Sequence, residues 1–166
     1  IYKFSKQEIN LVVAASYIDT LSLKSTKTTP SDIVECKNLI AKYDLNKDEM
    51  YLDGLSITDM SDLKACTLNG LKKYEINNNR VYSSYVQVTE DELNKIPLIL
   101  KEIPRTMRNK GVDYFIFIVT NVSNMTTKSY LLSKNFGSSI EVMEYNHIAS
   151  RGQEIIPELE RKLMRK

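Results

Sequence analysis

The chain has 166 residues, of which 42% are hydrophobic and 27% are charged. This is the size of one domain, or of a small domain with an appended piece, and the apolar share is enough to bury a core. The 23 Lys+Arg residues and 21 Asp+Glu residues leave a net charge of +2, which argues against nucleic-acid binding through bulk positive charge. With one histidine, His147, and two cysteines, Cys36 and Cys66, the chain cannot build a His/Cys metal cluster alone.

The two cysteines also indicate the cellular compartment in which the protein would work. Cys36 and Cys66 are far apart in the sequence and form no CxxC motif, so we expect free thiols in a reducing, cytoplasmic setting. The longest apolar run, residues 114–119, is far shorter than the roughly 20 residues that span a bilayer, so we expect a soluble protein with no membrane partner. Because the chain begins with Ile1 rather than Met, we expect it to be a piece of a longer protein.

The N-terminal region predicts one helix followed by a boundary. Ser5 and Glu8 form a capping-box pattern that opens a largely buried helix of about three turns, ending near Tyr17. Asp19 would follow just past its end, where a carboxylate is costly if it is buried and unpaired. The polar run 24–30 ends in proline and predicts a domain boundary near residue 28.

Three further helical segments are expected before the sheet. Ser31 is predicted to cap an amphipathic helix whose apolar positions have a spacing of three to four residues. These positions are Ile33, Cys36, Ile40 and Tyr43. Two short helices are expected over residues 48–55 and 61–67.

The period then changes from helical to extended. Residues 72–76 and 81–88 flank the triple asparagine 77–79, and asparagine tolerates positive φ, so the pattern predicts a β-hairpin. Thr89 and Glu92 form a further capping-box pattern, which predicts a long helix ending at Gly111.

That long helix contains Pro97 and Pro104, so a kink or break is expected at one of them. Residues 112–120 are apolar at both alternating sets of positions, which is typical of a central strand covered on both faces.

The remaining strands and the last helix complete the expected fold. After polar residues 121–126, we expect a strand over residues 128–133, a turn at 135–138, an edge strand over 140–145 and a terminal helix opened by Pro157. The fold class is therefore predicted to be α/β, with a mixed sheet of roughly five strands flanked by helices.

Familiar catalytic motifs are missing from the sequence. It contains no P-loop, GxGxxG, GxSxG or HExxH motif. Cys-His catalysis would require Cys36 or Cys66 with His147, but both cysteines lie on apolar faces of predicted helices, where Cys behaves as a small hydrophobe.

A candidate anion site lies in the segment 147–153, which contains Ser150 and Arg151 between a strand and the last helix. A guanidinium beside backbone amides suits phosphate, although Arg151 alone could equally be a solvated surface charge. Lys72 and Lys73 form a second positive cluster, whose alternative reading is a sheet edge protected by lysine. Asp19 is either a metal-ligating carboxylate or an ordinary helix-terminal residue, and its spacing alone favours the second reading.

Three segments resemble one known family. Residues 14–30, with the pair Asp19-Thr20, resemble the segment that joins the two domains of manganese-dependent (family II) inorganic pyrophosphatases of the DHH phosphoesterase superfamily. Residues 111–121 are similar to a strand of that family's second domain, called DHHA2. Residues 150–157 occupy the place of its Ser-Arg-Lys-Lys-Gln loop.

The resemblance implies a two-part organisation. Residues 1–28 would be a helix-strand remnant of the DHH domain, and residues 29–166 would be the DHHA2 substrate-binding domain. The parent would be a hydrolase that uses two manganese ions, held mostly by the missing domain, and this chain alone would be inactive. Its partner would be pyrophosphate or a short polyphosphate, with no nucleic acid, and the parent could be a homodimer.

The resemblance also implies residue roles. Asp19 would be the one metal ligand in this chain, whereas Arg151, Ser150 and Lys72 would bind substrate, with Lys73 replacing Lys72 if the alignment shifts by one. The chain departs from the family loop at Gly152 and Gln153, where the family has lysines. Two alternatives follow from this departure: an exopolyphosphatase-like parent, or a non-catalytic regulatory or interaction module.

Overall fold

The structure is a computed structural model that describes residues 3–20, 22–25, 28–46, 57–134 and 139–164. The chain divides into two compact units, Ile1–Ser56 and Ile57–Lys166, which are described separately. The helix expected at 48–55 and the turn expected at 135–138 lie outside the described residues. No helix in the described ranges is long and apolar enough to cross a membrane.

The first unit contains two helices, α1 (Lys6–Asp19) and α2 (Pro30–Tyr43). The capping box of Ser5 and Glu8 is confirmed at the start of α1. The predicted cap of α2 was wrong: Thr29, not Ser31, is the N-cap, and its box partner is Asp32. Pro30 explains the difference, because proline has no N–H to satisfy and is well suited to the first helical position.

Helix α1 is less buried than its apolar sequence predicts. Only one stripe, Ile9, Val13 and Tyr17, is buried, and it packs with Cys36 of α2 in a common cluster. Leu11, Val12 and Ile18 are exposed. The expected strand after this helix is absent from the described part of residues 20–28, which forms turns, with positive φ at Ser22 and Leu23.

The boundary expected near residue 28 falls between α1 and α2, within the first compact unit. The two helices stay together because apolar residues of both form their shared core. The assignment of residues 1–28 to a DHH domain and 29–166 to DHHA2 stays a prediction.

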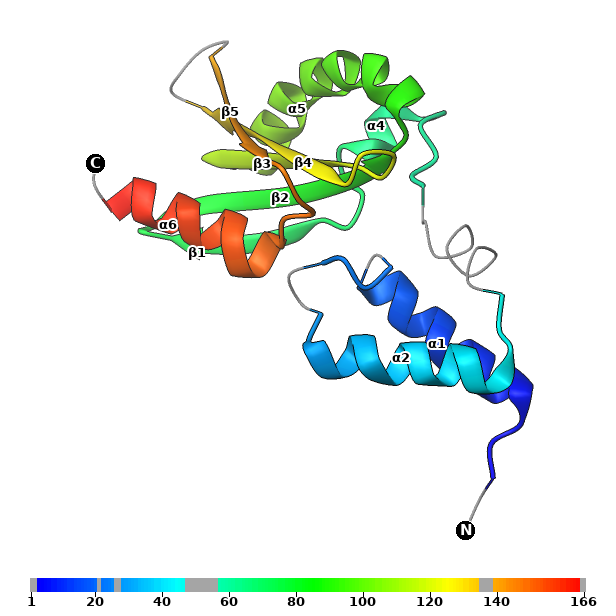
Figure 1. Cartoon of the computed structure of the whole chain (residues 1–166). Helices are drawn as coiled ribbons and strands as arrows, with labels where there is room; N and C mark the ends of the chain where they lie inside the picture. The colour runs from blue at the N-terminus through cyan, green and yellow to red at the C-terminus, as the bar shows by residue number, and fades with distance from the viewer. Residues whose placement is uncertain (1–2, 21, 26–27, 47–56, 135–138, 165–166) are drawn as a thin grey trace. The chain divides into compact units, whose positions relative to one another are not determined.

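The second unit is built on a five-stranded sheet with strand order β1-β2-β3-β4-β5 (Figure 1). The strands are β1 (Lys72–Ile76), β2 (Asn79–Val88), β3 (Tyr114–Asn121), β4 (Thr126–Ser133) and β5 (Ile140–Tyr145). Strands β2 and β3 are parallel and the other neighbours are antiparallel. The predicted α/β class with a mixed sheet, the hairpin, the central strand β3 and the edge strand β5 are therefore confirmed.

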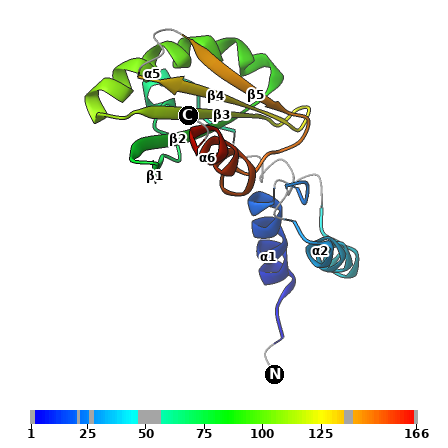
Figure 2. The same cartoon turned by 90° about the vertical axis from the view of Figure 1, so that its left-hand side faces the viewer.

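Helices cover both faces of this sheet (Figure 2). Helices α4 (Leu63–Cys66) and α5 (Ile96–Lys110) pack on one face around Phe115 and Phe117. Helix α6 (Ile156–Met164) packs on the other face, around Ile116 and Ile118. Alternate residues of β3 thus enter two separate cores, which is why the run Phe115–Val119 is apolar at every position.

The long helix before β3 differs from its prediction at its start. Thr89 makes no side-chain cap, and residues Glu90–Lys95 form a 3₁₀ helix. Helix α5 begins only at Ile96, so the expected break lies next to Pro97, which occupies the first turn. The helix then continues through Pro104 to Gly111, whose positive φ ends it as expected.

Candidate functional site

The segment expected to be a loop around Arg151 is the first turn of a helix. Residues Arg151–Ile155 form a π-helical turn that runs directly into α6, so the terminal helix begins before Pro157. Ser150 is its N-cap, and its hydroxyl accepts a hydrogen bond from the Gln153 amide at 3.3 Å. A π-helical turn is rare and is often found at functional sites, and the first amides of a helix favour an anion.

Arg151 is anchored on the sheet by one of its nitrogens. Its Nη1 donates to the carbonyl oxygens of Gly70 at 2.7 Å and Ser83 at 3.3 Å. Its guanidinium lies 5.3 Å from the centre of the Tyr85 ring, at cation–π distance. No acceptor for Nε or Nη2 is seen in the described part of the chain, so the rest of the fork can bind a phosphate oxygen.

Gly70 makes this arrangement sterically feasible. Its φ is +56°, and a Cβ at this position would lie 2.1 Å from Cε1 of Tyr85. The backbone around it is tied to β2, because Asn69 exchanges hydrogen bonds with the backbone of Tyr85. The Gly70 carbonyl and the Tyr85 ring therefore both hold the Arg151 guanidinium in place, and any larger residue at position 70 would displace the ring.

The sheet register places Lys72 and Lys73 on opposite faces. Lys72 pairs with Ser83, and Lys73 pairs with Tyr82. Directly paired residues share a face, and successive residues alternate. Lys72 thus shares the face of Ser83 and Tyr85, where Arg151 lies, whereas the ammonium of Lys73 lies over the Tyr82 ring at 5.6 Å.

Ser83 connects the two cationic groups. Its carbonyl accepts from Arg151, its backbone pairs with Lys72, and its own hydroxyl is buried without a partner among the described residues. A buried polar atom without a partner needs an explanation, of which an ordered water or a bound ligand is the ordinary one. Arg151 and Lys72, 79 positions apart in sequence, are therefore both neighbours of Ser83 on the same face of the sheet.

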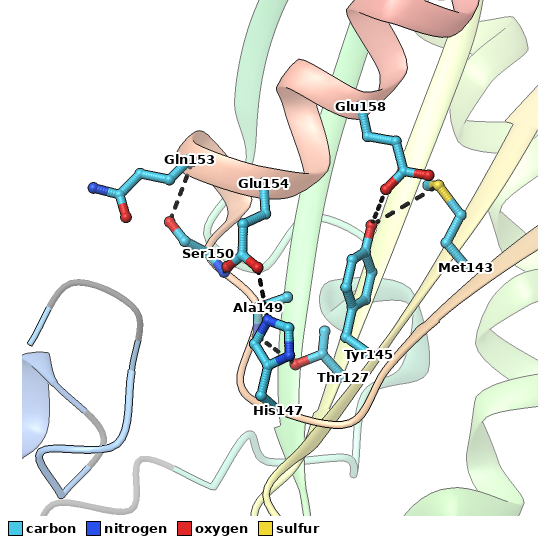
Figure 3. Close-up of polar contacts among 9 residues, drawn as sticks. All are labelled: Thr127, Met143, Tyr145, His147, Ala149, Ser150, Gln153, Glu154 and Glu158. Carbon is cyan, nitrogen blue, oxygen red and sulfur yellow. Dashed lines mark hydrogen bonds and ion pairs between the residues drawn. The ribbon is translucent and has the colours of Figure 1, made fainter.

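Glu154 and His147 hold the turn that bears Arg151 (Figure 3). One carboxylate oxygen of Glu154 accepts from the Ser150 amide at 2.7 Å, and the other lies 2.6 Å from Nε2 of His147. With the Ser150 hydroxyl capping Gln153, this is a reciprocal capping arrangement in which the carboxylate comes four residues after the cap instead of three.

Two further contacts fix this segment to the sheet, as Figure 3 shows. The Ala149 amide donates to the Thr127 hydroxyl at 3.0 Å, and the Tyr145 hydroxyl donates to Glu158 at 2.8 Å. Burial, reinforced by the Glu158 carboxylate, raises the pKa of Tyr145 well above its usual range, so its hydroxyl stays protonated and keeps donating.

Gly152 and Gln153, the two departures from the family loop, are both exposed. A Cβ at Gly152 would meet no atom within 4 Å. The space next to Arg151 is therefore open at this position, and no cation there adds to the charge of Arg151.

Asp19 is the last residue of α1 and is exposed. No group of three or more His, Cys, Asp or Glu side chains that could hold a metal ion occurs in the described ranges of the chain. These residues therefore do not form a manganese site by themselves, and Asp19 belongs to the first compact unit, whereas Arg151 and Lys72 belong to the second.

Sequence reasoning did not identify Gly70, Ser83, Tyr85 or Glu154 as part of this site. Glu154 had a local signal, because it lies one turn after the capping Ser150. The other three lie on β2 or immediately before β1, and nothing local in the sequence relates them to Arg151. Cys36 and Cys66 are buried free thiols whose pKa is raised mainly by burial, as expected of small hydrophobes.

Known proteins share sequence and fold with this chain. No protein-family model matches the chain. Curated proteins named "Probable manganese-dependent inorganic pyrophosphatase" are 25% identical over 175 residues in Bacillus licheniformis, 26% over 172 in Bacillus cereus and 26% over 168 in Streptococcus agalactiae. These alignments cover 93–95% of this chain and 54–55% of the relatives, so the chain spans about half their length.

A solved structure shows the same fold. The crystal structure of a Methanococcus jannaschii protein, titled "putative family II inorganic pyrophosphatase", superposes with a TM-score of 0.77 at 21% identity. The match covers 96% of this chain and 57% of that chain. The chain is thus similar in sequence to proteins named as probable manganese-dependent inorganic pyrophosphatases, and in fold to a structure titled as a putative family II inorganic pyrophosphatase, over about half the length of each.

Proposed function

We propose that this chain is the substrate-binding part of a manganese-dependent pyrophosphatase-like hydrolase, and that it binds pyrophosphate between Arg151 and Lys72. The observation that supports this most directly is that Arg151 and Lys72 are both neighbours of Ser83 on one face of the sheet, although they are 79 positions apart. Arg151 would supply two guanidinium nitrogens, the exposed Lys72 would supply an ammonium, and the first turn at Ser150 would supply backbone amides. Together they would stabilise the negative charge of a phosphoric anhydride.

The catalytic metals would be held by residues outside this chain. A manganese site requires several oxygen or nitrogen ligands, and the described residues offer no such group, so most of the ligands would come from elsewhere. Asp19 would contribute one carboxylate to that site. Manganese would supply charge stabilisation and an activated water when bound. The chain alone would then bind pyrophosphate without hydrolysing it, which a phosphate-release assay with Mn²⁺ can check.

The buried, unbridged cysteines of the chain fit a reducing, cytoplasmic compartment.

A longer polyphosphate is the second candidate substrate. Gly152 leaves open space beside Arg151 where the family loop has a lysine. An exopolyphosphatase-like parent would use this space for the continuing phosphate chain. If tripolyphosphate binds at least tenfold more tightly than pyrophosphate at equal ionic strength, the polyphosphate reading is favoured.

The sheet register supplies a matched pair of variants for the main proposal. Lys72→Ala and Lys73→Ala remove the same charge from adjacent residues of one strand, but only Lys72 shares the face of Arg151. We expect Lys72→Ala to weaken pyrophosphate binding several-fold and Lys73→Ala to change it less than twofold, measured by titration calorimetry on the chain.

Equal effects of the two variants would mean that only bulk charge matters, and the proposed site would be wrong. No effect of either variant would favour a non-catalytic module that has lost phosphate binding. Circular dichroism of both variants checks that the sheet is intact.

A further inference from the structure

A groove lies on the sheet face opposite Arg151, between α5 and the end of β4. It has a volume of about 860 Å³, which is within the range of small-molecule sites. Its lining includes Leu132 and Val112, which belong to the core on the α5 side, whereas Arg151 contacts Tyr85 on the α6 side. The phosphate groups discussed above therefore do not reach it through the sheet.

The floor of the groove is apolar. Leu100, Pro104 and Met107 line it from one side of α5, at a spacing of three to four residues. Val112 and Leu132 complete it and are 2% and 5% exposed. These five side chains offer hydrocarbon contact, so they suit an aliphatic or aromatic body.

The wall of the groove is cationic. Arg80, Lys101, Arg108 and Lys134 line it, and no carboxylate is found among its described lining residues. Asp113, which is not among the residues lining the groove, forms ion pairs with Arg80 and Lys134. The described part of the chain shows no ion pair for Lys101 or Arg108, so their charges are available to a ligand.

Helix geometry brings these two charges to one side. Lys101 and Arg108 are seven residues apart, which is two turns and about 10.5 Å along α5. Pro104 lies between them on the same side. At the helix end, the guanidinium of Arg80 lies over Gly111, where a Cβ would be 3.1 Å from Nη2. An anionic head would meet cations at both ends of the apolar floor.

We propose that this groove binds a small, soluble organic anion with an apolar body, of the class of medium-chain carboxylates and aryl sulfonates. An anion without apolar surface, such as phosphate, would leave the floor hydrated. A neutral apolar molecule would leave Lys101 and Arg108 unused. The combination of apolar floor and unpaired cations therefore selects an amphipathic anion.

The experiment uses the 166-residue chain with 1-anilinonaphthalene-8-sulfonate as the probe and dodecanoate as the competitor. We expect saturable binding at one site, displacement by dodecanoate, and no displacement by 1-octanol or inorganic phosphate at constant ionic strength. Backbone amide chemical shifts should move in residues 97–112 and 130–134, and should stay unchanged in residues 150–155.

The variant Lys101→Glu/Arg108→Glu should weaken probe binding at least tenfold. The matched control is Arg105→Glu, which adds a carboxylate to an exposed position of the same helix that does not line the groove, and it should change binding less than twofold. If the reversed pair fails to fold, Lys101→Gln/Arg108→Gln should still weaken binding by about threefold.

Four results would overturn the proposal. One is an equal loss in the control variant, the second is binding that does not respond to either pair of substitutions, and the third is shift changes confined to residues 150–155. Equal displacement by 1-octanol would show that the cations have no role and would also contradict it.

Discussion

Gly152 provides the sharpest test of the anion site, because its substitution changes charge without disturbing structure. A Cβ at this position would meet no atom within 4 Å, and φ is not in the left-handed region. The variant Gly152→Lys therefore places a cation one residue from Arg151, in the first turn of the terminal helix. We expect pyrophosphate to bind this variant more tightly than the natural chain.

The size of the gain follows from the exposure of the position. Two unit charges about 4 Å apart interact by about 1 kcal/mol in water and about 4 kcal/mol near a protein surface. Because Gly152 is exposed, the lower figure applies, which corresponds to about a fivefold lower Kd. Replacing glycine in a helix also stabilises the fold by up to about 1 kcal/mol, whatever the charge.

Titration calorimetry with pyrophosphate, without metal, measures the effect at low and high salt. Gly152→Ala is the matched control, because it has the helix-stabilising effect without the charge. The fivefold gain should appear in Gly152→Lys alone and should shrink between 0.01 and about 0.3 M salt, since the screening length falls from about 30 Å to below 10 Å. Equal affinities for the lysine and alanine variants would refute the reasoning.

Three other predictions concern the groups that hold the site and the sheet. Arg151→Lys should lower pyrophosphate affinity about tenfold in calorimetry, because lysine has one nitrogen and lacks the fork that contacts Gly70 and Ser83 through Nη1 while directing its other nitrogens to phosphate; an unchanged affinity would contradict the anchoring. Glu154→Ala should lower the free energy of unfolding by about 1 kcal/mol in urea, because the Ser150 amide loses its acceptor, whereas Glu154→Gln should recover most of this loss. Asp113→Asn should lower the free energy of unfolding by about 2 kcal/mol at pH 7. The hydrogen bond from Lys134, with a second from the Arg80 amide, lowers the pKa of Asp113 in the folded chain. The ionised Asp113 carboxylate therefore stabilises the fold above the unfolded-state pKa of about 3.9, and this stabilisation is lost as the pH falls through the lower folded-state pKa. The difference between variant and natural chain should therefore vanish in urea titrations at acid pH, and a difference that stays constant with pH would exclude this ion pair as its cause.

Much of the second unit could be predicted from local patterns. The hairpin follows from the asparagines at its turn, since Asn77 and Asn78 both adopt positive φ, and β3 follows from an apolar run that only two-sided burial explains. The choice between two neighbouring residues that could each cap the same helix was harder to predict. Thr29 and Ser31 are both good caps, and the choice between them depends on which residue leaves Pro30 in the first helical position.

The sequence by itself determined the sheet, the two helix-covered faces, the burial of the cysteines and the presence of cations at residues 72, 73 and 151. Only the tertiary structure decided which of these cations act together. The register of β1 on β2 turns Lys72 toward the face of Arg151 and Lys73 toward Tyr82. Register and face depend on contacts between segments far apart in the chain, and such contacts leave no periodic pattern in the sequence. The site is therefore a property of the fold, although every residue in it can be read in the sequence.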